Sequence, residues 1–204
     1  MRQLVFRRYV GSQFRAVFEP LARLRIAVFR EFPYLYEGSM AYETTYLNTY
    51  AQAERSLLVA VFDDERMVGA TTCLPLTDET ADVQEPFRKA GYDLNRLVYF
   101  GESLLLPAYR GLGLGHRFFD EREAHAAHFG TYTMTCFCAV QRPETHPLRP
   151  ASYRPLDAFW RSRGYQRDPS LQSTFFWTDL GETKETGKVM TYWTRPLPVR
   201  QVGK

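Results

Sequence analysis

Long hydrophobic runs are missing from this 204-residue sequence. The longest apolar stretches, such as residues 104–106 with their neighbours, are far shorter than the roughly 18 consecutive apolar residues that a membrane-spanning helix needs. The N-terminal apolar run is broken at Arg7 and Arg8, so it lacks the continuous hydrophobic region of a secretory signal. We therefore expect a protein without a membrane segment that stays in the cytoplasm.

Cysteine is also scarce. The three cysteines, Cys73, Cys136 and Cys138, form no even-numbered disulfide framework and include no C-x-x-C pair that could bind zinc. His125 and His128 lie three residues apart on a predicted helix, but no acidic or cysteine partner accompanies them in the sequence. We expect no metal site, with the cysteines as packing residues and the histidines at the surface.

The sequence has no Gly/Ser-rich or Pro-rich linker, no repeat and no low-complexity tract. With 45% hydrophobic and 24% charged residues, its composition is that of a globular protein. A net charge of +3 without a lysine-rich tail argues against nucleic-acid binding and names no other partner. We expect one domain over residues 1–204.

The spacing of hydrophobic residues predicts more strands than helices. Helices are expected over residues 12–32, with a kink at Pro20, and over 40–55, 114–129 and 155–163, with an irregular helical connection over 78–91. Strands are expected over residues 3–9, 56–62, 67–74, 96–106, 131–140, 171–178 and 188–195. Hairpins coexist with a strand-helix-strand crossover, so the predicted class is a mixed-sheet domain, α/β or α+β.

A glycine-rich turn lies between the strand that stops before Pro107 and the helix that follows. It reads Arg110-Gly111-Leu112-Gly113-Leu114-Gly115, with His116 next. The first N–H groups of a helix have no partner inside the helix and carry the positive end of its dipole, so this turn suits a phosphate or pyrophosphate. Glycines let the backbone approach the anion, and Arg110 can add charge-assisted hydrogen bonds. The turn is not a dinucleotide fingerprint, whose third glycine would fall on His116, and no Gly-Lys-Ser/Thr follows as in a Walker loop.

This turn resembles the main signature of the GNAT superfamily of N-acetyltransferases, Arg/Gln-x-x-Gly-x-Gly/Ala, which Arg110, Gly113 and Gly115 fill without substitution. The segment Ala158–Tyr165 resembles the second signature of the family, and the order of elements is similar from residue 3 to about 195. The resemblance implies a central, mostly antiparallel sheet with a splayed strand pair and flanking helices. It also implies an enzyme that transfers an acetyl group from acetyl-CoA directly to an amine of a small molecule or protein.

The resemblance assigns two parts of the chain to acetyl-CoA. Ser103, Leu104 and Leu105 would line the pantetheine arm, and the glycine-rich turn, through His116, would bind the pyrophosphate. The sequence departs from the family at Trp160, where the second signature usually has a Tyr that can protonate the departing thiolate. An indole N–H is not a usable acid at neutral pH, so Tyr153, Tyr165 or water would have to take that place.

Glu102 is the first candidate for a general base, which acetyl transfer needs because a free alkylammonium has a pKa near 10.4. It interrupts an apolar strand directly after Gly101, where a bulge or a close backbone approach is expected. A carboxylate in such a setting would have a raised pKa. The alternative is that Glu102 points to solvent or pairs with an Arg.

The family forms its acceptor site partly from the loop between the first two helices, which contains Tyr34, Tyr36 and Glu37. Aromatic rings with Glu31, Glu37 and Glu43 nearby suit a cationic amine, although the same loop could simply cover the core. The basic residues Arg142, His146, Arg149, Arg154, Arg161 and Arg163 could hold the 3′-phosphate of CoA, an acidic acceptor or only solvent.

Two other functions compete with an acetyltransferase. A non-catalytic acyl-CoA-binding regulatory module would keep the glycine turn and lack the chemistry, as the substitution at Trp160 suggests. Nucleic-acid binding through residues 142–167 is a weaker alternative, because prolines interrupt the arginines there. The identity of the acceptor, the acyl-chain preference and the oligomeric state, including a homodimer, stay open at this stage.

Overall fold

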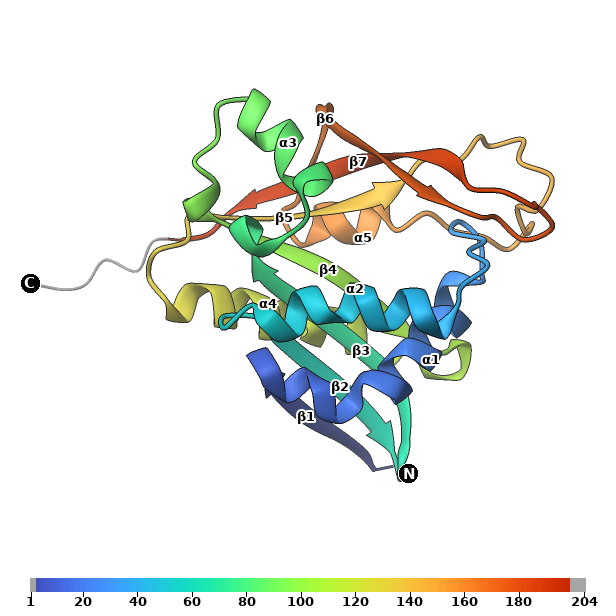
Figure 1. Cartoon of the computed structure of the whole chain (residues 1–204), viewed down its shortest axis with the longest axis horizontal. Coiled ribbons are helices and arrows are strands. Elements are labelled where there is room, and N and C mark those ends of the chain that lie inside the picture. The colour runs from blue at the N-terminus through green and yellow to red at the C-terminus, as the bar shows by residue number, and fades with distance from the viewer. Residues whose placement is uncertain (1–2, 199–204) are drawn as a thin grey trace, which may run out of the picture.

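The computed structural model describes residues 3–198 and contains seven strands and five α-helices in this part of the chain (Figure 1). The strands are β1 Leu4–Val10, β2 Leu57–Asp63, β3 Arg66–Pro75, β4 Leu97–Leu105, β5 Met134–Val140, β6 Gln166–Trp177 and β7 Thr186–Pro196. The helices are α1 Phe18–Phe29, α2 Met40–Gln52, α3 Ala81–Lys89, α4 Leu114–His128 and α5 Asp157–Ser162. None of the described helices is long and apolar enough to cross a membrane.

All seven strands form one sheet in the order β1-β2-β3-β4-β5-β7-β6. Every neighbouring pair is antiparallel except β4 and β5, which run parallel and are joined by the crossover helix α4. The parallel pairing covers only residues 97–99 of β4 and 134–136 of β5, after which the two strands separate. The predicted mixed, mostly antiparallel sheet with a splayed strand pair is therefore confirmed.

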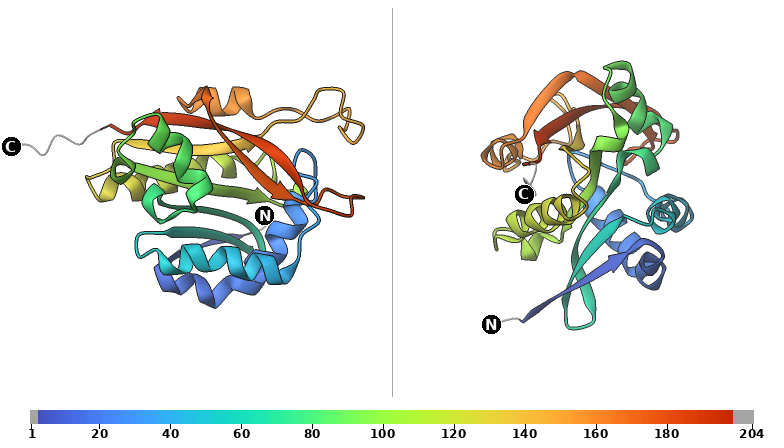
Figure 2. Two further views of the ribbon diagram at one scale, coloured as in Figure 1. Left: turned by 45° about the horizontal axis from the view of Figure 1, so that its top comes forward. Right: turned by 90° about the vertical axis from the view of Figure 1, so that its left-hand side faces the viewer.

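Helices cover both faces of the sheet, and the right-hand view of Figure 2 shows α1, α2 and α3 on one side with α4 and α5 on the other. On the first side the core includes Phe14, Leu21, Leu47, Leu58 and Leu104. On the second side it consists largely of aromatic rings, among them Phe100, Phe119, Phe137, Tyr165 and Trp193. β4 and β5, the strands that separate, thus lie between two packed layers of helices.

Two predicted elements differ from the structure. The helix expected over residues 12–32 is divided into a 3-10 helix over residues 11–17 and α1, and Pro20 lies in the first turn of α1, where its missing N–H breaks no helical bond and causes no kink. β6 begins at Gln166 rather than at Leu171, because its pairing with β7 shifts register between Asp168 and Gln172. Pro169 lies in this shifted segment and has no N–H to donate to β7. A proline argues against a strand in the sequence, so the first residues of β6 were not predicted.

The bulge expected beside Gly101 is present in β4. Thr71 pairs with Ser103 and Cys73 pairs with Phe100, so two residues of β4, Gly101 and Glu102, lie opposite the single residue Thr72. A Cβ atom at Gly101 would lie 1.9 Å from the hydroxyl oxygen of Tyr50. Glycine is required here by the close approach of α2, and the bulge redirects the Glu102 side chain that follows.

Candidate active site

The glycine-rich turn begins α4 with backbone conformations that favour glycine. Gly111 and Gly113 have φ angles of 77° and 76°, in the left-handed region, and Gly113 is the N-cap of α4. A Cβ atom at either position would meet no atom within 4 Å, so the space outside the turn is open. The unpaired N–H groups of the first turn of α4 therefore face a region that an anion could enter.

Arg110 does not point freely into solvent. Its terminal nitrogens donate to the carboxylate of Glu31 over 2.8 and 3.1 Å, and its Nε donates to the carbonyl oxygen of Leu105 over 3.1 Å. Both side chains of this ion pair are more than 40% exposed, and exposed pairs of this kind contribute only about 0 to 1 kcal/mol. A phosphate could therefore replace Glu31 as the partner of Arg110 at little cost.

The remaining predicted contacts of acetyl-CoA lie along the end of β4 and the start of α4. Ser103 is exposed, Leu104 is buried in the core below α1, and Leu105 is partly buried. The pairing of β4 with β5 ends at Tyr99. The backbone N–H and C=O groups of residues 103–105 that face β5 therefore form no ladder hydrogen bonds with it. Leu112 is exposed, and the ring of His116 contacts the ring of Phe159 on α5 with centroids 4.9 Å apart.

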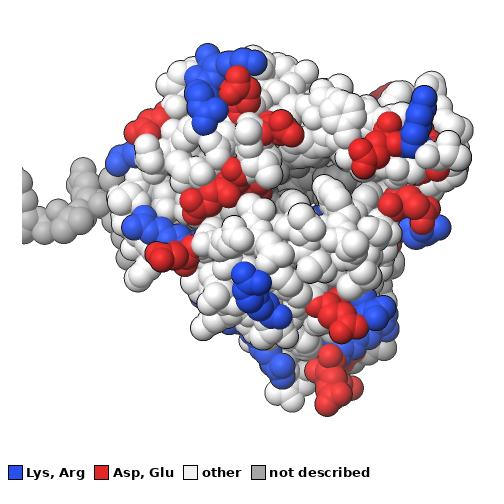
Figure 3. Space-filling view, in the orientation of Figure 1, with Lys and Arg blue, Asp and Glu red and all other residues white. Residues whose placement is uncertain are grey.

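The place where β4 and β5 separate coincides with a hollow in the molecular surface. In Figure 3, which has the orientation of Figure 1, this hollow lies above α2 and below β5. Its rim is largely uncharged, with acidic side chains farther out on both its left and its right. The separated strands thus leave an opening on the side of the sheet that carries α1 and α2.

Glu102, on the part of β4 that has separated from β5, is buried, with its side chain 1% exposed. Its carboxylate forms an ion pair with Arg25 of α1, which also pairs with Glu43 of α2. Burial raises the pKa of the Glu102 carboxyl, and the charge of Arg25 opposes that shift. The expected pairing with an Arg is therefore present, yet the carboxylate is not on the surface.

The backbone of Glu102 is held as well. Its carbonyl oxygen accepts hydrogen bonds from Thr71 Oγ1 over 2.7 Å and from Arg122 of α4 over 3.2 Å. Arg122 is buried against the rings of Phe100 and Phe119, and burial lowers the pKa of its guanidinium to about 10. Arginines from opposite faces of the sheet therefore fix the carboxylate and the carbonyl of the same residue.

The loop between α1 and α2, residues 30–39, contains the three predicted acceptor residues. Tyr34 lies with its ring between those of Phe29 and Trp177, and burial raises the pKa of its hydroxyl. Tyr36 is half-buried and its ring contacts that of Tyr42. Glu37 is exposed and pairs with Arg30. Tyr34 and Tyr36 therefore lie on the side facing the interior, whereas Glu37 does not.

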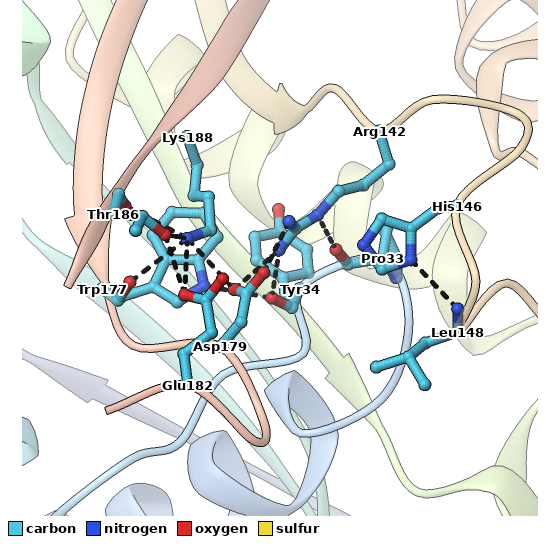
Figure 4. A network of polar contacts seen from close by, with 10 residues as sticks. All are labelled: Pro33, Tyr34, Arg142, His146, Leu148, Trp177, Asp179, Glu182, Thr186 and Lys188. Atoms are coloured by element: carbon cyan, nitrogen blue, oxygen red, sulfur yellow. Dashed lines mark hydrogen bonds and ion pairs between the residues drawn. The ribbon is translucent and has the colours of Figure 1, made fainter. Parts of the chain in front are cut away.

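A polar network ties this loop to the loop between β6 and β7, residues 178–185 (Figure 4). Arg142 donates to the carbonyl oxygens of Pro33 and Tyr34, each over 2.8 Å, and forms two hydrogen bonds with the carboxylate of Asp179. Lys188 lies 3.3 Å from the same carboxylate on its other side. Arg142 is thus a structural clamp between the two loops, and its guanidinium is already engaged rather than available to the 3′-phosphate of CoA.

Comparison with known proteins agrees with this geometry. A model of the acetyltransferase (GNAT) family matches residues 21–149, more than half of the chain. The chain belongs to the GNAT acetyltransferase family. No curated protein sequence matches it.

Several solved structures share the fold. NAA60 of Arabidopsis thaliana in complex with acetyl-CoA aligns with a TM-score of 0.61 at 12% identity, covering 96% of this chain and 99% of that chain. An acetyltransferase from Thermus thermophilus aligns at 0.56 and 16% identity, covering 97% and 100%. The ribosomal-protein-S18-alanine N-acetyltransferase of Escherichia coli aligns at 0.54 and 12%, covering 96% and 94%. At these identities the likeness establishes the fold alone.

The tyrosines considered as acids in this GNAT chain lie in different places. The hydroxyl of Tyr165 is buried and lies 2.8 Å from Thr135 Oγ1 and 3.3 Å from a carboxylate oxygen of Glu123, below the closed end of the strand pair. The ring of Tyr153 packs edge-on against Phe32 of the α1–α2 loop, and Tyr153 is partly exposed. Trp160 packs against Phe137 and Trp193. Only Tyr153 lies beside the α1–α2 loop.

Sequence reasoning missed Arg25, which lies at the centre of the buried ion pairs. A signal was present, because Arg25 follows Leu21 by four residues and so interrupts the apolar stripe of its helix. Asp179 and Lys188 were missed too, and here no signal existed. Asp179 pairs with Arg142, which lies 37 residues away, and Lys188 joins them through Asp179, so only the folded chain brings the three together.

Proposed function

We propose that this GNAT protein is an N-acetyltransferase that moves the acetyl group of acetyl-CoA directly to an amine of a small molecule or protein, within one domain over residues 1–204. One observation carries the proposal. The open glycine turn at the start of α4 and the buried carboxylate of Glu102 belong to the same strand-turn-helix unit, where β4 leaves β5. A glycine turn suited to phosphate and a buried carboxylate in one strand-turn-helix unit support the proposal.

Acetyl-CoA would bind along this unit. Its pyrophosphate would accept hydrogen bonds from N–H groups of the glycine turn and of the start of α4, with Arg110 exchanging Glu31 for a phosphate. The N–H of His116 already donates to the carbonyl oxygen of Gly113 over 3.1 Å. Its pantetheine arm would follow the backbone of residues 103–105, which β5 leaves unpaired. The acetyl-CoA complex of the Arabidopsis NAA60 protein, which has the same fold, supports this co-substrate.

The chemistry would use Glu102 as the base. The ammonium form of the acceptor gives one proton to the carboxylate, and the neutral amine attacks the thioester carbonyl. The C–S bond breaks, and the CoA thiolate takes a proton from the new amide nitrogen, through solvent or Tyr153. Tyr165 is the weaker candidate for this step, because its hydroxyl is already bonded to Thr135 and Glu123.

Replacing Glu102 by Gln tests this assignment. The amide keeps the size of the side chain and can still accept from Arg25, but it cannot take the proton. At neutral pH kcat should fall by about a hundredfold, and it should recover as the pH approaches the amine pKa near 10.4, where the amine is already neutral. Acetyl-CoA affinity, measured by calorimetry, should be unchanged. A variant with the wild-type rate at every pH would remove Glu102 from the mechanism.

The packing of Trp160 favours a second candidate, a regulatory module that binds acyl-CoA without turnover. In this structure Trp160 occupies the aromatic layer with Phe137 and Trp193, in the position where the family usually has its acid. Such a module would bind acetyl-CoA with the same glycine turn. It would release no CoA thiol with any amine, which separates the two candidates.

A further inference from the structure

The two edges of the seven-stranded sheet are protected differently. An edge strand exposes backbone N–H and C=O groups to which another strand can pair, and proteins usually prevent this with charged residues, prolines or bulges. At one edge, β1 carries the exposed Arg7 and Arg8. At the other edge, β6 has Arg167, Asp168 and Pro169 and a register shift, but only near its start. The rest of β6 has no such protection.

The unprotected part is residues 170–178, which we call the β6 edge segment. It contains no charged residue, no proline and no glycine, and its aromatic and Thr residues favour a strand. β7 pairs with residues 172–177 along one side of the segment. Within residues 3–198, no hydrogen bond from a segment other than β7 reaches the backbone of residues 171–176. Because alternate residues of an antiparallel strand direct their N–H and C=O groups away from the partner, the outer side of the segment is free to pair.

The side chains on the face of the β6 edge segment away from α3 are uncharged. Ser173 lies on the α3 side, where its hydroxyl donates to the carbonyl oxygen of Asp82 over 2.6 Å. On the opposite face Gln172, Thr174 and Phe176 are exposed, and Phe176 is exposed by 62%. An uncharged strand brings no like charges together when it pairs with its own copy. The segment is therefore compatible with itself.

A groove of about 470 Å³ lies between α3 and the β6 edge segment, at the top of the molecule in Figure 1. One stripe of α3 lines it, with Asp82 and Glu85 near the start of the helix and Lys89 at its end. Glu85 and Lys89 pair over 3.3 Å, but both are exposed, so this pair is weak and can exchange partners. The acidic start and the basic end make the stripe complementary to a reversed copy of itself.

We propose that the β6 edge segment pairs antiparallel with the same segment of a second copy of this chain, joining the two sheets across a two-fold axis. An axis perpendicular to the sheet keeps the α3 helices of both copies on one face and reverses the direction of one relative to the other. The acidic start of each α3 stripe then faces the basic end of the other. Main-chain hydrogen bonds supply the affinity, and the reversed charges favour a second copy over an unrelated extended peptide.

Thr174→Lys tests the inference, because it places a charge near the centre of the paired segments, where like charges meet across the axis. By light scattering, the wild-type protein should reach twice the 23.8 kDa mass of one chain as its concentration rises. The dissociation constant of the variant dimer should be at least about tenfold larger. Val5→Lys is the matched control, since Val5 is exposed on the opposite edge strand β1 and gains the same charge. It should change the dissociation constant by no more than about twofold.

Lys89→Glu tests the contribution of α3. Replacing the basic end of the stripe by an acid brings like charges together across the axis, so the dissociation constant should rise about threefold to tenfold. Arg88→Glu is its control, because Arg88 is exposed on the same helix and does not line the groove. It should change the constant by less than about twofold. An equal rise in both variants would overturn the two-fold arrangement.

Hydrogen exchange of the wild-type protein covers the case in which Thr174→Lys does not fold. Amides of the β6 edge segment should exchange at least about tenfold more slowly above the dissociation constant than below it, while those of β1 should not change. Slower exchange in another segment instead would contradict the proposed surface. A wild-type protein that stays monomeric at every concentration would overturn the inference, including one that binds an extended peptide at β6.

Discussion

Gly101→Ala should destabilise the protein far more than its single added methyl group would suggest. The new Cβ would lie 1.9 Å from the Tyr50 hydroxyl oxygen and 2.7 Å from Thr72 Oγ1. To reach an ordinary contact of about 3.5 Å, the Tyr50 hydroxyl would have to move by roughly 1.6 Å. Tyr50 is fully buried, so the surrounding core resists that movement.

The cost can be estimated from the contacts that would be lost. Overpacking a core costs about 1 to 3 kcal/mol. Displacing the Tyr50 hydroxyl also breaks its 3.0 Å hydrogen bond to the buried Glu79 carboxylate, which adds about 1 to 3 kcal/mol. We therefore expect Gly101→Ala to lower the free energy of unfolding by about 2 to 6 kcal/mol in urea titrations followed by circular dichroism.

A double variant makes this reasoning specific to Tyr50. Tyr50→Phe alone should cost about 1 to 3 kcal/mol, because Glu79 loses its donor. In Gly101→Ala/Tyr50→Phe the clashing oxygen is absent, so the combined loss should be smaller than the sum of the two by about 1 kcal/mol or more. Strict additivity, or a Gly101→Ala protein as stable as the wild type, would refute the explanation of the bulge.

Three further variants address the rest of the site. Arg110→Ala should weaken acetyl-CoA binding about tenfold to a hundredfold in calorimetry, and unchanged affinity would exclude Arg110 from the site. The free energy of unfolding should change by less than about 1 kcal/mol, since the pair of Arg110 with Glu31 is exposed. Gly113→Val should weaken acetyl-CoA binding more than Arg110→Ala does, because a residue with a side chain is strained at a φ of 76°. Tighter acetyl-CoA binding by Gly113→Val than by Arg110→Ala would contradict this. Arg142→Met leaves the buried Asp179 with only Lys188 and should lower the free energy of unfolding by about 3 to 5 kcal/mol in urea; a loss below 1 kcal/mol would show that the clamp in Figure 4 is dispensable.

The sequence predicted those parts of the molecule that depend on neighbours along the chain. The apolar character of residues 96–106, the glycine turn and the helix after it identified the central strand-turn-helix unit, and Gly101 before Glu102 identified the bulge. These features are local, because a left-handed turn or a strand period is encoded in a few consecutive residues.

What the sequence did not predict depends on contacts between distant segments. The pair that Arg110 forms with Glu31, 79 residues away, was not foreseen. Arg142 was grouped with other arginines as a candidate for the 3′-phosphate, but its partners are Asp179 and the carbonyl oxygens of the α1–α2 loop. The partner of a charged side chain follows from the tertiary fold, which a single sequence does not reveal.

The most direct test of the acetyltransferase assignment is the release of CoA thiol from acetyl-CoA by the wild-type protein, measured with and without primary amines. Mass spectrometry of the amines in the same samples identifies the product. We predict thiol release that depends on the amine and equals the amount of acetylated amine formed. Binding of acetyl-CoA with no amine-dependent thiol release across the panel would contradict the assignment and leave a module that only binds acyl-CoA.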